Sequence, residues 1–189
     1  HGCDVDPTGE YIVGSGKLAA TMTIHSFSKM KQAIADKDFD GSTYGIPILN
    51  FKSVNYGVLK QPGLGPLHTE FDSRGNAYTT FFISSEVVKW NIKDLTVLDR
   101  NPVYYSVGHL MIPGGNSRTP DDKYLVAMNK ITKDRYLPTG PEVCQSAQLF
   151  DISGEKLELL LDFPTIGEPH YAAGIAADKI ASKSKKIYR

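Results

Sequence analysis

Asp72-Ser73-Arg74-Gly75-Asn76-Ala77-Tyr78-Thr79 is an Asp-x-x-Gly turn followed directly by a strand-like sequence. Related phrases begin at Asp6 and Asp151, and residues 119–126 hold a variant with Asp122 in the glycine position. In such a phrase the Asp side chain accepts hydrogen bonds from backbone amides two residues on, and the glycine supplies a positive φ that tightens the hairpin. A recurring turn-and-strand phrase at irregular spacing predicts propeller hairpins with insertions between them, and leaves a β-sandwich as the alternative.

Short segments rich in β-branched, aromatic and aliphatic residues, bounded by Gly, Pro, Asn or Asp, predict strands along most of the chain. The clearest are residues 11–15, 77–83, 87–91, 123–128 and 157–161. One helix is predicted over residues 26–37, with Ser26 as its N-cap and Phe27, Met30 and Ile34 on one face. Residues 41–65 and 113–121 are rich in loop-forming residues, so we expect loops there.

Composition excludes several classes of function. Lysine plus arginine and aspartate plus glutamate each total 21, so the net charge is zero and no basic field attracts nucleic acid. No apolar run reaches the roughly 18 residues that a membrane helix needs. Cys3 and Cys144 lie far apart and outside any C-x-x-C pair. We expect two buried thiols there, with a disulfide as the alternative, and no thiolate metal site.

Four of the five histidines precede the repeated turns or open the last segment. His1 and His68 stand shortly before their turns, His109 lies further upstream of its own, and His170 opens the last segment. In a propeller we expect the strand entering such a turn to be the innermost of its blade, so four blades would deliver four imidazoles to the central channel. Clustered imidazoles suit copper, zinc or iron; the alternative is four separately hydrogen-bonded structural histidines. His25 has no such turn after it and is expected to be structural or exposed.

Several longer sequence motifs resemble those of nitrous-oxide reductase. They occur in the same order as in that family and are spread over nearly the whole chain. The motifs are residues 1–9, 65–80, 87–91, 108–110, 129–141 and 168–170. The resemblance implies an all-β chain forming about three to four blades of a seven-bladed β-propeller, not closed within this sequence. It also implies that residues 1–189 are an internal part of the N-terminal catalytic propeller, without the C-terminal cupredoxin domain.

The activity implied by this resemblance is copper-dependent reduction of nitrous oxide to dinitrogen and water, with two electrons and two protons, in denitrification. It would occur at a tetranuclear copper–sulfide centre fed by a dinuclear copper centre in the cupredoxin domain. The family further implies a periplasmic homodimer and an electron donor such as a c-type cytochrome or cupredoxin. The isolated 189 residues are expected to be inactive. Two alternatives remain from residue patterns alone: a non-enzymatic propeller that binds partners on its face, and a calcium-stabilised sandwich.

The resemblance also assigns roles to individual residues. The copper ligands would be His1, His68, His109 and His170, with three more ligands, including a His-His pair, expected upstream. Lys130 and Glu168 match a charged pair beside the cluster that would stabilise negative charge and help deliver protons. Calcium would be held by the backbone carbonyl of Lys130 and the side chain of Gln145, with Glu142 as a substitute, because Gln145 stands where the family usually has a carboxylate. The insertion at residues 113–116 resembles the atypical branch of the family.

Overall fold

The computed structural model describes residues 1–130, 145–175 and 180, and it contains three four-stranded antiparallel sheets. Blade 1 is formed by β1 (Gly2–Val5), β2 (Tyr11–Ser15), β3 (Thr21–Ser26) and β6 (Asn55–Lys60). Blade 2 is formed by β7 (Pro66–Phe71), β8 (Asn76–Phe81), β9 (Glu86–Asn91) and β10 (Thr96–Pro102). Blade 3 is formed by β11 (Val107–Met111), β12 (Tyr124–Asn129), β13 (Ser146–Asp151) and β14 (Glu158–Pro164).

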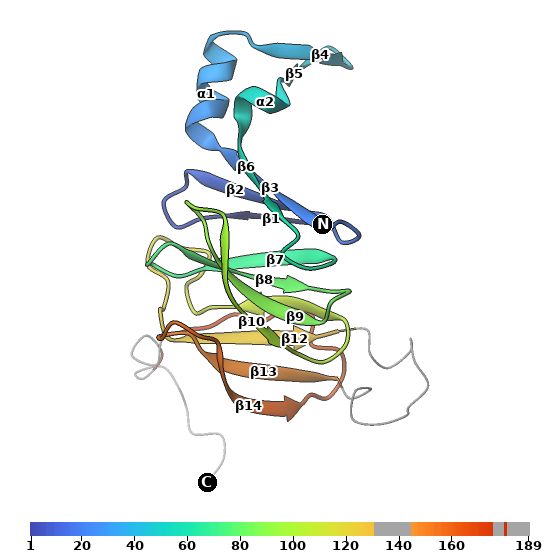
Figure 1. Ribbon diagram of the computed structural model, residues 1–189, viewed down its shortest axis with the longest axis vertical. Helices are drawn as coiled ribbons and strands as arrows, with labels where there is room; N and C mark the ends of the chain where they lie inside the picture. Colours follow the sequence, from blue (N-terminus) through green and yellow to red (C-terminus); the bar gives the residue numbers. More distant parts are fainter. Residues whose placement is uncertain (131–144, 176–179, 181–189) are drawn as a thin grey trace.

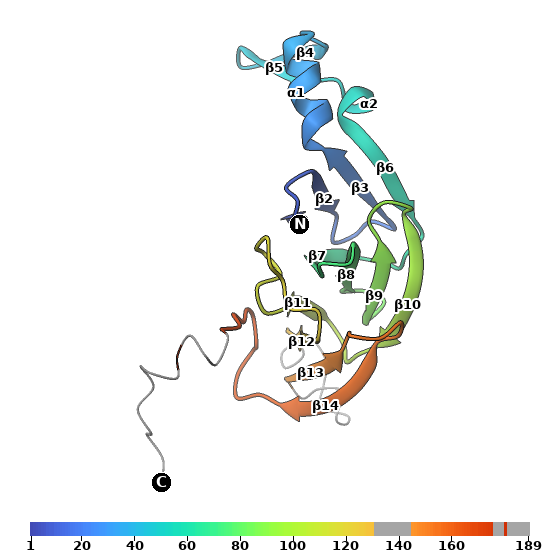
Figure 2. The same cartoon turned by 90° about the vertical axis from the view of Figure 1, so that its left-hand side faces the viewer.

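The three blades stack in chain order, as Figure 1 shows. The outer strands β6, β10 and β14 form one convex edge in Figure 2, and the first strands of the blades lie on the opposite, inner side. Contacts between blades include β1 with β7 and β7 with β11, so the first strand of each blade is its innermost. None of the sheets in the described part of the chain closes on itself. The prediction of an all-β, open, partial propeller is therefore confirmed, with three blades in view.

Two apolar cores hold the blades together. The core between blades 1 and 2 is built from Val13, Met22, Ile24, Leu59, Phe71, Ala77, Phe81, Val88, Trp90 and Ile92. The core between blades 2 and 3 is built from Tyr78, Val87, Val107, Leu110, Ile112, Leu125, Ala127, Phe150, Ile152 and Leu157. Because successive side chains of a strand point to opposite faces, β8 and β9 contribute to both cores. On β14, which has no further blade against it, Leu159 to Leu161 are each about half exposed.

The repeated turns form largely as expected. The Asp6 carboxylate accepts the amide of Tyr11 at 2.8 Å, and the Asp72 carboxylate accepts that of Asn76 at 2.9 Å. Gly9 has a φ of 78° and Gly75 a φ of 86°. The Asp151 turn differs, because it joins the two outer strands β13 and β14 rather than following an innermost strand. The expectation that every such phrase marks an innermost strand is therefore wrong there: a turn phrase specifies a hairpin, not its place in a blade.

An insertion between β3 and β6 projects beyond blade 1 (Figure 1) and contains α1 (Phe27–Ala35), β4 (Phe39–Thr43), β5 (Ile46–Leu49) and α2 (Phe51–Val54). Ser26 caps α1 by accepting the Lys29 amide at 3.1 Å, as predicted. The apolar face expected on α1 is not buried, since Phe27 is 49% and Ile34 57% exposed. The loop expected over residues 41–65 is also wrong, because this stretch includes β6, whose pairing with β3 spans the whole insertion.

The other predicted strands are confirmed, with β2, β8, β9, β12 and β14 within a few residues of their expected ends. Cys3 is free and exposed, so the expected burial of this thiol is wrong. The reason is strand alternation: Gly2 faces inward and is buried, which turns Cys3 to the opposite side of β1. Cys144 lies outside the described residues. Within the described part of the chain, no helix has the length and apolar character needed to cross a bilayer.

Candidate metal centre

Two of the candidate histidines sit in β-bulges of innermost strands. Opposite β8, the register of β7 shifts between Pro66 and Thr69, which places His68 in the bulge. Opposite β12, the register of β11 shifts between Val107 and Leu110, which places His109 in the bulge. A bulge adds one residue to one strand and re-aims the side chains around it, and bulges are frequent beside functional sites. The strand pattern alone therefore does not set the direction of either imidazole.

Two glycines beside the histidines allow close approaches that a side chain would block. A Cβ on Gly2 would lie 1.9 Å from the Leu67 carbonyl oxygen, so β1 can approach β7 this closely only with glycine. A Cβ on Gly108 would lie 2.7 Å from Cδ of Lys130, whose stem crosses that point. His1 precedes Gly2 and His109 follows Gly108 in the sequence. The two glycines thus bring the histidine-bearing segments and Lys130 together.

The four candidate histidines form a continuous row. The ring centroids of His1 and His68 are 5.5 Å apart, and those of His68 and His109 are 3.9 Å apart in a stacked arrangement. The rings of His109 and His170 follow at 4.9 Å. Residues from three separate strand regions and the segment after β14 therefore meet at one place. Among the described side chains, no three His, Cys, Asp or Glu groups are arranged to hold one metal ion.

The environments of His68 and His109 differ. Asp4 on β1 places Oδ1 at 3.7 Å from Nδ1 of His68, and its Oδ2 accepts the Thr69 amide at 2.8 Å. Nδ1 of His109 is buried and has no hydrogen-bond partner. Burial, reinforced by the neighbouring His68, Lys130 and His170, lowers the pKa of His109 to about 4. His109 is therefore neutral near pH 7, the form in which imidazole binds metals.

His170 lies in the segment after β14 and has a charged partner at each ring nitrogen. Nζ of Lys130 lies 3.4 Å from Nε2, and the Glu168 carboxylate lies 3.4 Å from Nδ1. Lys130 is buried; burial first, and then the charge of Lys17, lower its pKa, while the charge of Glu168 opposes the shift. The structure thus places Lys130 and Glu168 beside the row of histidines. For His170 to bind a metal, one of its ring nitrogens has to exchange its present partner.

The two residues considered for calcium lie at one end of the β12–β13 hairpin. Asn129 and Ser146 form the last pair of this ladder, and Lys130 and Gln145 are the next residues on each side. The Lys130 amide donates to Ser106, and the Gln145 carbonyl accepts from Thr165. Gln145 is half-buried, and Glu142 lies outside the described residues.

Glu70, which sequence patterns did not single out, is a buried carboxylic acid beside this row. It is 6% exposed; Oε1 accepts from Asn116 at 2.9 Å, whereas Oε2 has no hydrogen-bond partner. Burial raises the pKa of Glu70 to about 8. Glu70 lies two residues after His68, and in a regular strand the two side chains would share a face. The bulge at this point makes the direction of either side chain unpredictable from the sequence. His25 on β3, by contrast, packs edge-on against Phe51 on α2 of the insertion, with the ring centroids 5.6 Å apart.

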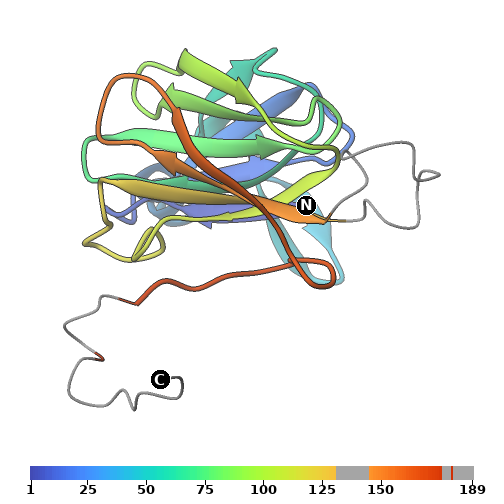
Figure 3. The same ribbon diagram turned by 90° about the horizontal axis from the view of Figure 1, so that it is seen from below.

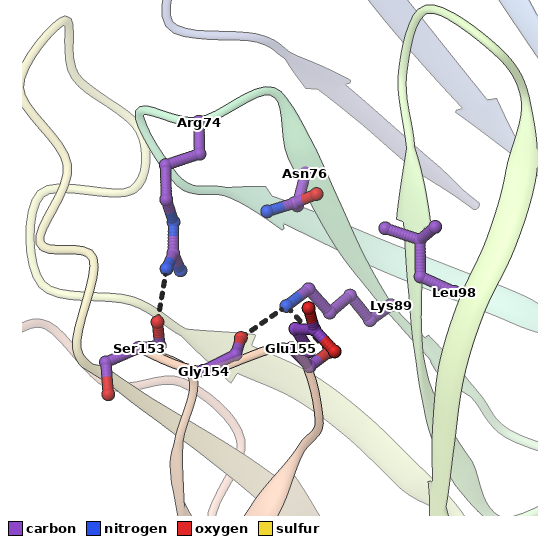
Figure 4. Close-up of a pocket in the computed structure, with 7 residues that line it drawn as sticks. All are labelled: Arg74, Asn76, Lys89, Leu98, Ser153, Gly154 and Glu155. Atoms are coloured by element: carbon purple, nitrogen blue, oxygen red, sulfur yellow. Dashed lines mark hydrogen bonds between the residues drawn. The ribbon is translucent and has the colours of Figure 1, made fainter.

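A cavity of about 520 Å³ lies elsewhere, between blades 2 and 3 (Figure 4). Arg74 reaches into it and donates to the carbonyls of Ile152 and Ser153, both at 2.6 Å. Lys89 donates to the carbonyls of Gly154 at 2.8 Å and Glu155 at 3.0 Å. Because these cations are already engaged by backbone carbonyls, the cavity is better explained as a clamp between blades than as an anion site.

Solved structures with a similar fold include proteins of low sequence identity. A chain in a crystal structure of the mitotic checkpoint complex superposes with a TM-score of 0.61 at 11% identity, over 91% of this chain and 41% of that one. A chain of Kuenenia stuttgartiensis hydrazine synthase gives a TM-score of 0.56 at 11% identity, over 87% of this chain and 36% of that one. At such identities the similarity shows the fold alone.

Sequence relatives are more specific. The family described as nitrous oxide reductase propeller repeat matches residues 100–170. The nitrous-oxide reductase of Stutzerimonas stutzeri is 38% identical and that of Pseudomonas fluorescens 35% identical, each over 100% of this chain. The chain spans 29% of the length of each of these relatives. It is therefore related over its whole length to the nitrous-oxide reductases, and it carries the propeller repeat of that family, as its sequence motifs indicated.

Proposed function

We propose that this chain supplies four imidazole ligands to the catalytic copper–sulfide cluster of a nitrous-oxide reductase. The observation that carries the proposal is the row formed by His1, His68, His109 and His170, whose neighbouring ring centroids lie between 3.9 and 5.5 Å apart. These residues are distant in the sequence, and ordinary structural histidines have no reason to converge from separate blades. The relatives that bear the name nitrous-oxide reductase support the same assignment.

The residues present fit a copper cluster on chemical grounds. The buried Nδ1 of His109 is an unpartnered donor atom, as is Nδ1 of His25, but only the His109 ring lies against two further imidazoles, those of His68 and His170, and an orphaned nitrogen in that setting suits a metal bond. The donor set is made of imidazoles without thiolates, which favours copper among the common metals. A row of rings extends over a longer distance than one ion spans, so it suits several metal ions better than a single one.

When bound, such a cluster would supply electrons and activate nitrous oxide for reduction to dinitrogen and water. The chain's own residues would hold and orient the ligands. Asp4 faces Nδ1 of His68 and so favours the tautomer that leaves Nε2 free to bind metal. Glu168 holds the ring of His170 from the Nδ1 side, and the Lys130 ammonium offers N–H donors to an anionic group nearby.

The rest of the assembly belongs to the same proposal. Residues 1–189 would be part of the N-terminal propeller domain, and the three further cluster ligands and the cupredoxin domain with its dinuclear copper centre would lie elsewhere in the protein. The whole enzyme would be a periplasmic homodimer that receives electrons from a c-type cytochrome or a cupredoxin. Calcium would bind at the end of the β12–β13 hairpin, through the Lys130 carbonyl and Gln145, which flank the last pair of that ladder.

The test is copper content and nitrous-oxide turnover of the whole protein, with His109→Gln compared with His25→Gln as a matched control. We expect His109→Gln to lose the cluster absorption and at least about 100-fold in turnover, because the neutral amide cannot replace an imidazole ligand. The His25→Gln protein should keep both. A wild-type protein that binds no copper and reduces no nitrous oxide would contradict the proposal and favour a non-enzymatic binding propeller.

A further inference from the structure

We propose that Glu70 is a positioning residue that holds the His170 arm in place through the loop that follows His109. The His170 arm is residues 165–175, and the hub loop is residues 112–117. The inference deepens the proposed function and rests on it, since it explains how the fourth imidazole reaches the other three.

Glu70 fastens the hub loop to β7. Its buried carboxylate accepts a hydrogen bond from Asn116 Nδ2 at 2.9 Å through Oε1. Its second oxygen packs against the loop backbone: a Cβ on Gly115 would lie 1.9 Å from Oε2. Because Gly115 has no side chain, the loop backbone lies against this carboxyl group without displacing it. The side chain therefore binds the hub loop at one oxygen and sets its distance from β7 at the other.

The hub loop in turn supports the His170 arm. A Cβ on Gly174 would lie 3.0 Å from Cβ of Pro113 and 3.1 Å from Sδ of Met111, so the arm packs tightly against the start of the loop. Tyr171 packs edge-on against the ring of His109 at 5.6 Å. A cavity of about 180 Å³ is lined by Glu70, by the hub loop and by residues 171–174. Glu70, the hub loop and the arm thus form one contiguous packing unit.

The His170 arm has few backbone hydrogen bonds to position it. It contains no strand after β14 ends, and Figure 3 shows it leaving the sheet. Within the described part of the arm, backbone hydrogen bonds to the rest of the protein are confined to Thr165, whose amide donates to Gln145 at 2.8 Å. The His170 side chain is 62% exposed, so burial does not fix it either. Packing of the arm against the hub loop therefore acts together with the Lys130 contact at Nε2 and the ring of His109 to set the position of this imidazole.

The test uses the whole protein and two independent readouts. In copper-free protein, we expect Glu70→Ala to speed amide hydrogen exchange at Gly115 and Ser117, the hub-loop amides that donate to the carbonyls of Ile112 and Gly114, about tenfold, the factor that one lost buried hydrogen bond carries. Exchange in β8 and β9 should not change. Glu70→Gln keeps an acceptor for Asn116 and should restore most of the protection. The matched control is Glu86→Ala, which removes a carboxylate on β9 that pairs with Arg100 and belongs to neither the hub loop nor the His170 arm.

In copper-loaded protein, we expect Glu70→Ala to change the absorption spectrum of the cluster and to bind fewer copper ions per chain, whereas Glu86→Ala should match the wild type. Unchanged exchange in the hub loop would overturn the positioning role, as would loosening spread evenly over all three blades. If the hub loop loosens but the wild-type protein binds no copper, the proposed function fails while the role of Glu70 in holding the hub loop stands. The two results therefore separate the inference from the function on which it rests.

Discussion

Substituting Gly2 by alanine tests a close backbone approach between blades 1 and 2. The added methyl carbon would lie 1.9 Å from the Leu67 carbonyl oxygen and 3.0 Å from the carbonyl carbon. Reaching an ordinary contact distance requires a displacement of about 1.5 Å. Both partners are backbone of paired strands, so neither can turn aside as a flexible side chain would. We expect a loss of about 3 kcal/mol in the free energy of unfolding, at the upper end of overpacking costs.

Thermal unfolding of the whole protein measures this effect. A loss of that size corresponds to a decrease in Tm of roughly 6–12 °C when the blades unfold as a unit of 150–250 residues, and to a smaller decrease when a larger propeller unfolds as one unit. The matched control is Gly154→Ala, because a Cβ at Gly154 meets no atom within 4 Å. We expect that control to change Tm by about 1 °C or less, as surface substitutions usually do. Equal Tm values for Gly2→Ala and the wild type would refute the inference that this glycine sets the spacing of the inner strands.

Three further substitutions test the packing between blades and the insertion. Thr80→Val removes the hydroxyl that donates to the Gly108 carbonyl at 2.5 Å and should lower the free energy of unfolding, measured by chemical denaturation, by about 1–3 kcal/mol. An unchanged denaturation midpoint would show that this hydrogen bond contributes nothing. Lys89→Met removes two hydrogen bonds to the turn after β13 and should lower the free energy of unfolding by about 2 kcal/mol, also measured by chemical denaturation. A variant more stable than the wild type would contradict the role of Lys89 in holding blades 2 and 3 together. Burial lowers the pKa of His25 from its ordinary 6.5, so the native state favours the neutral ring. The stability that this shift contributes is fully present above pH 6.5 and is lost as the pH falls below 6.5, because the unfolded state then binds protons more readily. We therefore expect the Tm of His25→Gln to depend less on pH between pH 7 and 5 than the Tm of the wild type does. An equal or steeper dependence would refute this prediction.

Prediction from sequence succeeded where structure is local. The turns at Asp6 and Asp72 form because an Asp carboxylate and a nearby glycine suffice to close a hairpin. The Ser26 cap likewise depends on one hydroxyl and an amide three residues away. Prediction failed for β6, because its pairing with β3 crosses an insertion that includes two helices and a hairpin. A pattern of a few residues carries no information about a partner that distant.

The same division holds for the candidate site. Sequence motifs were enough to indicate the resemblance to nitrous-oxide reductases and to select His1, His68, His109 and His170, since residue types and their order are given by the sequence itself. Only the tertiary structure shows that these rings form a row, because their directions depend on two bulges and on close approaches between separate blades. It alone reveals the role of Glu70, whose partners lie across a blade boundary. Local chemistry can be read from neighbouring residues, whereas convergence and burial arise only when the blades pack.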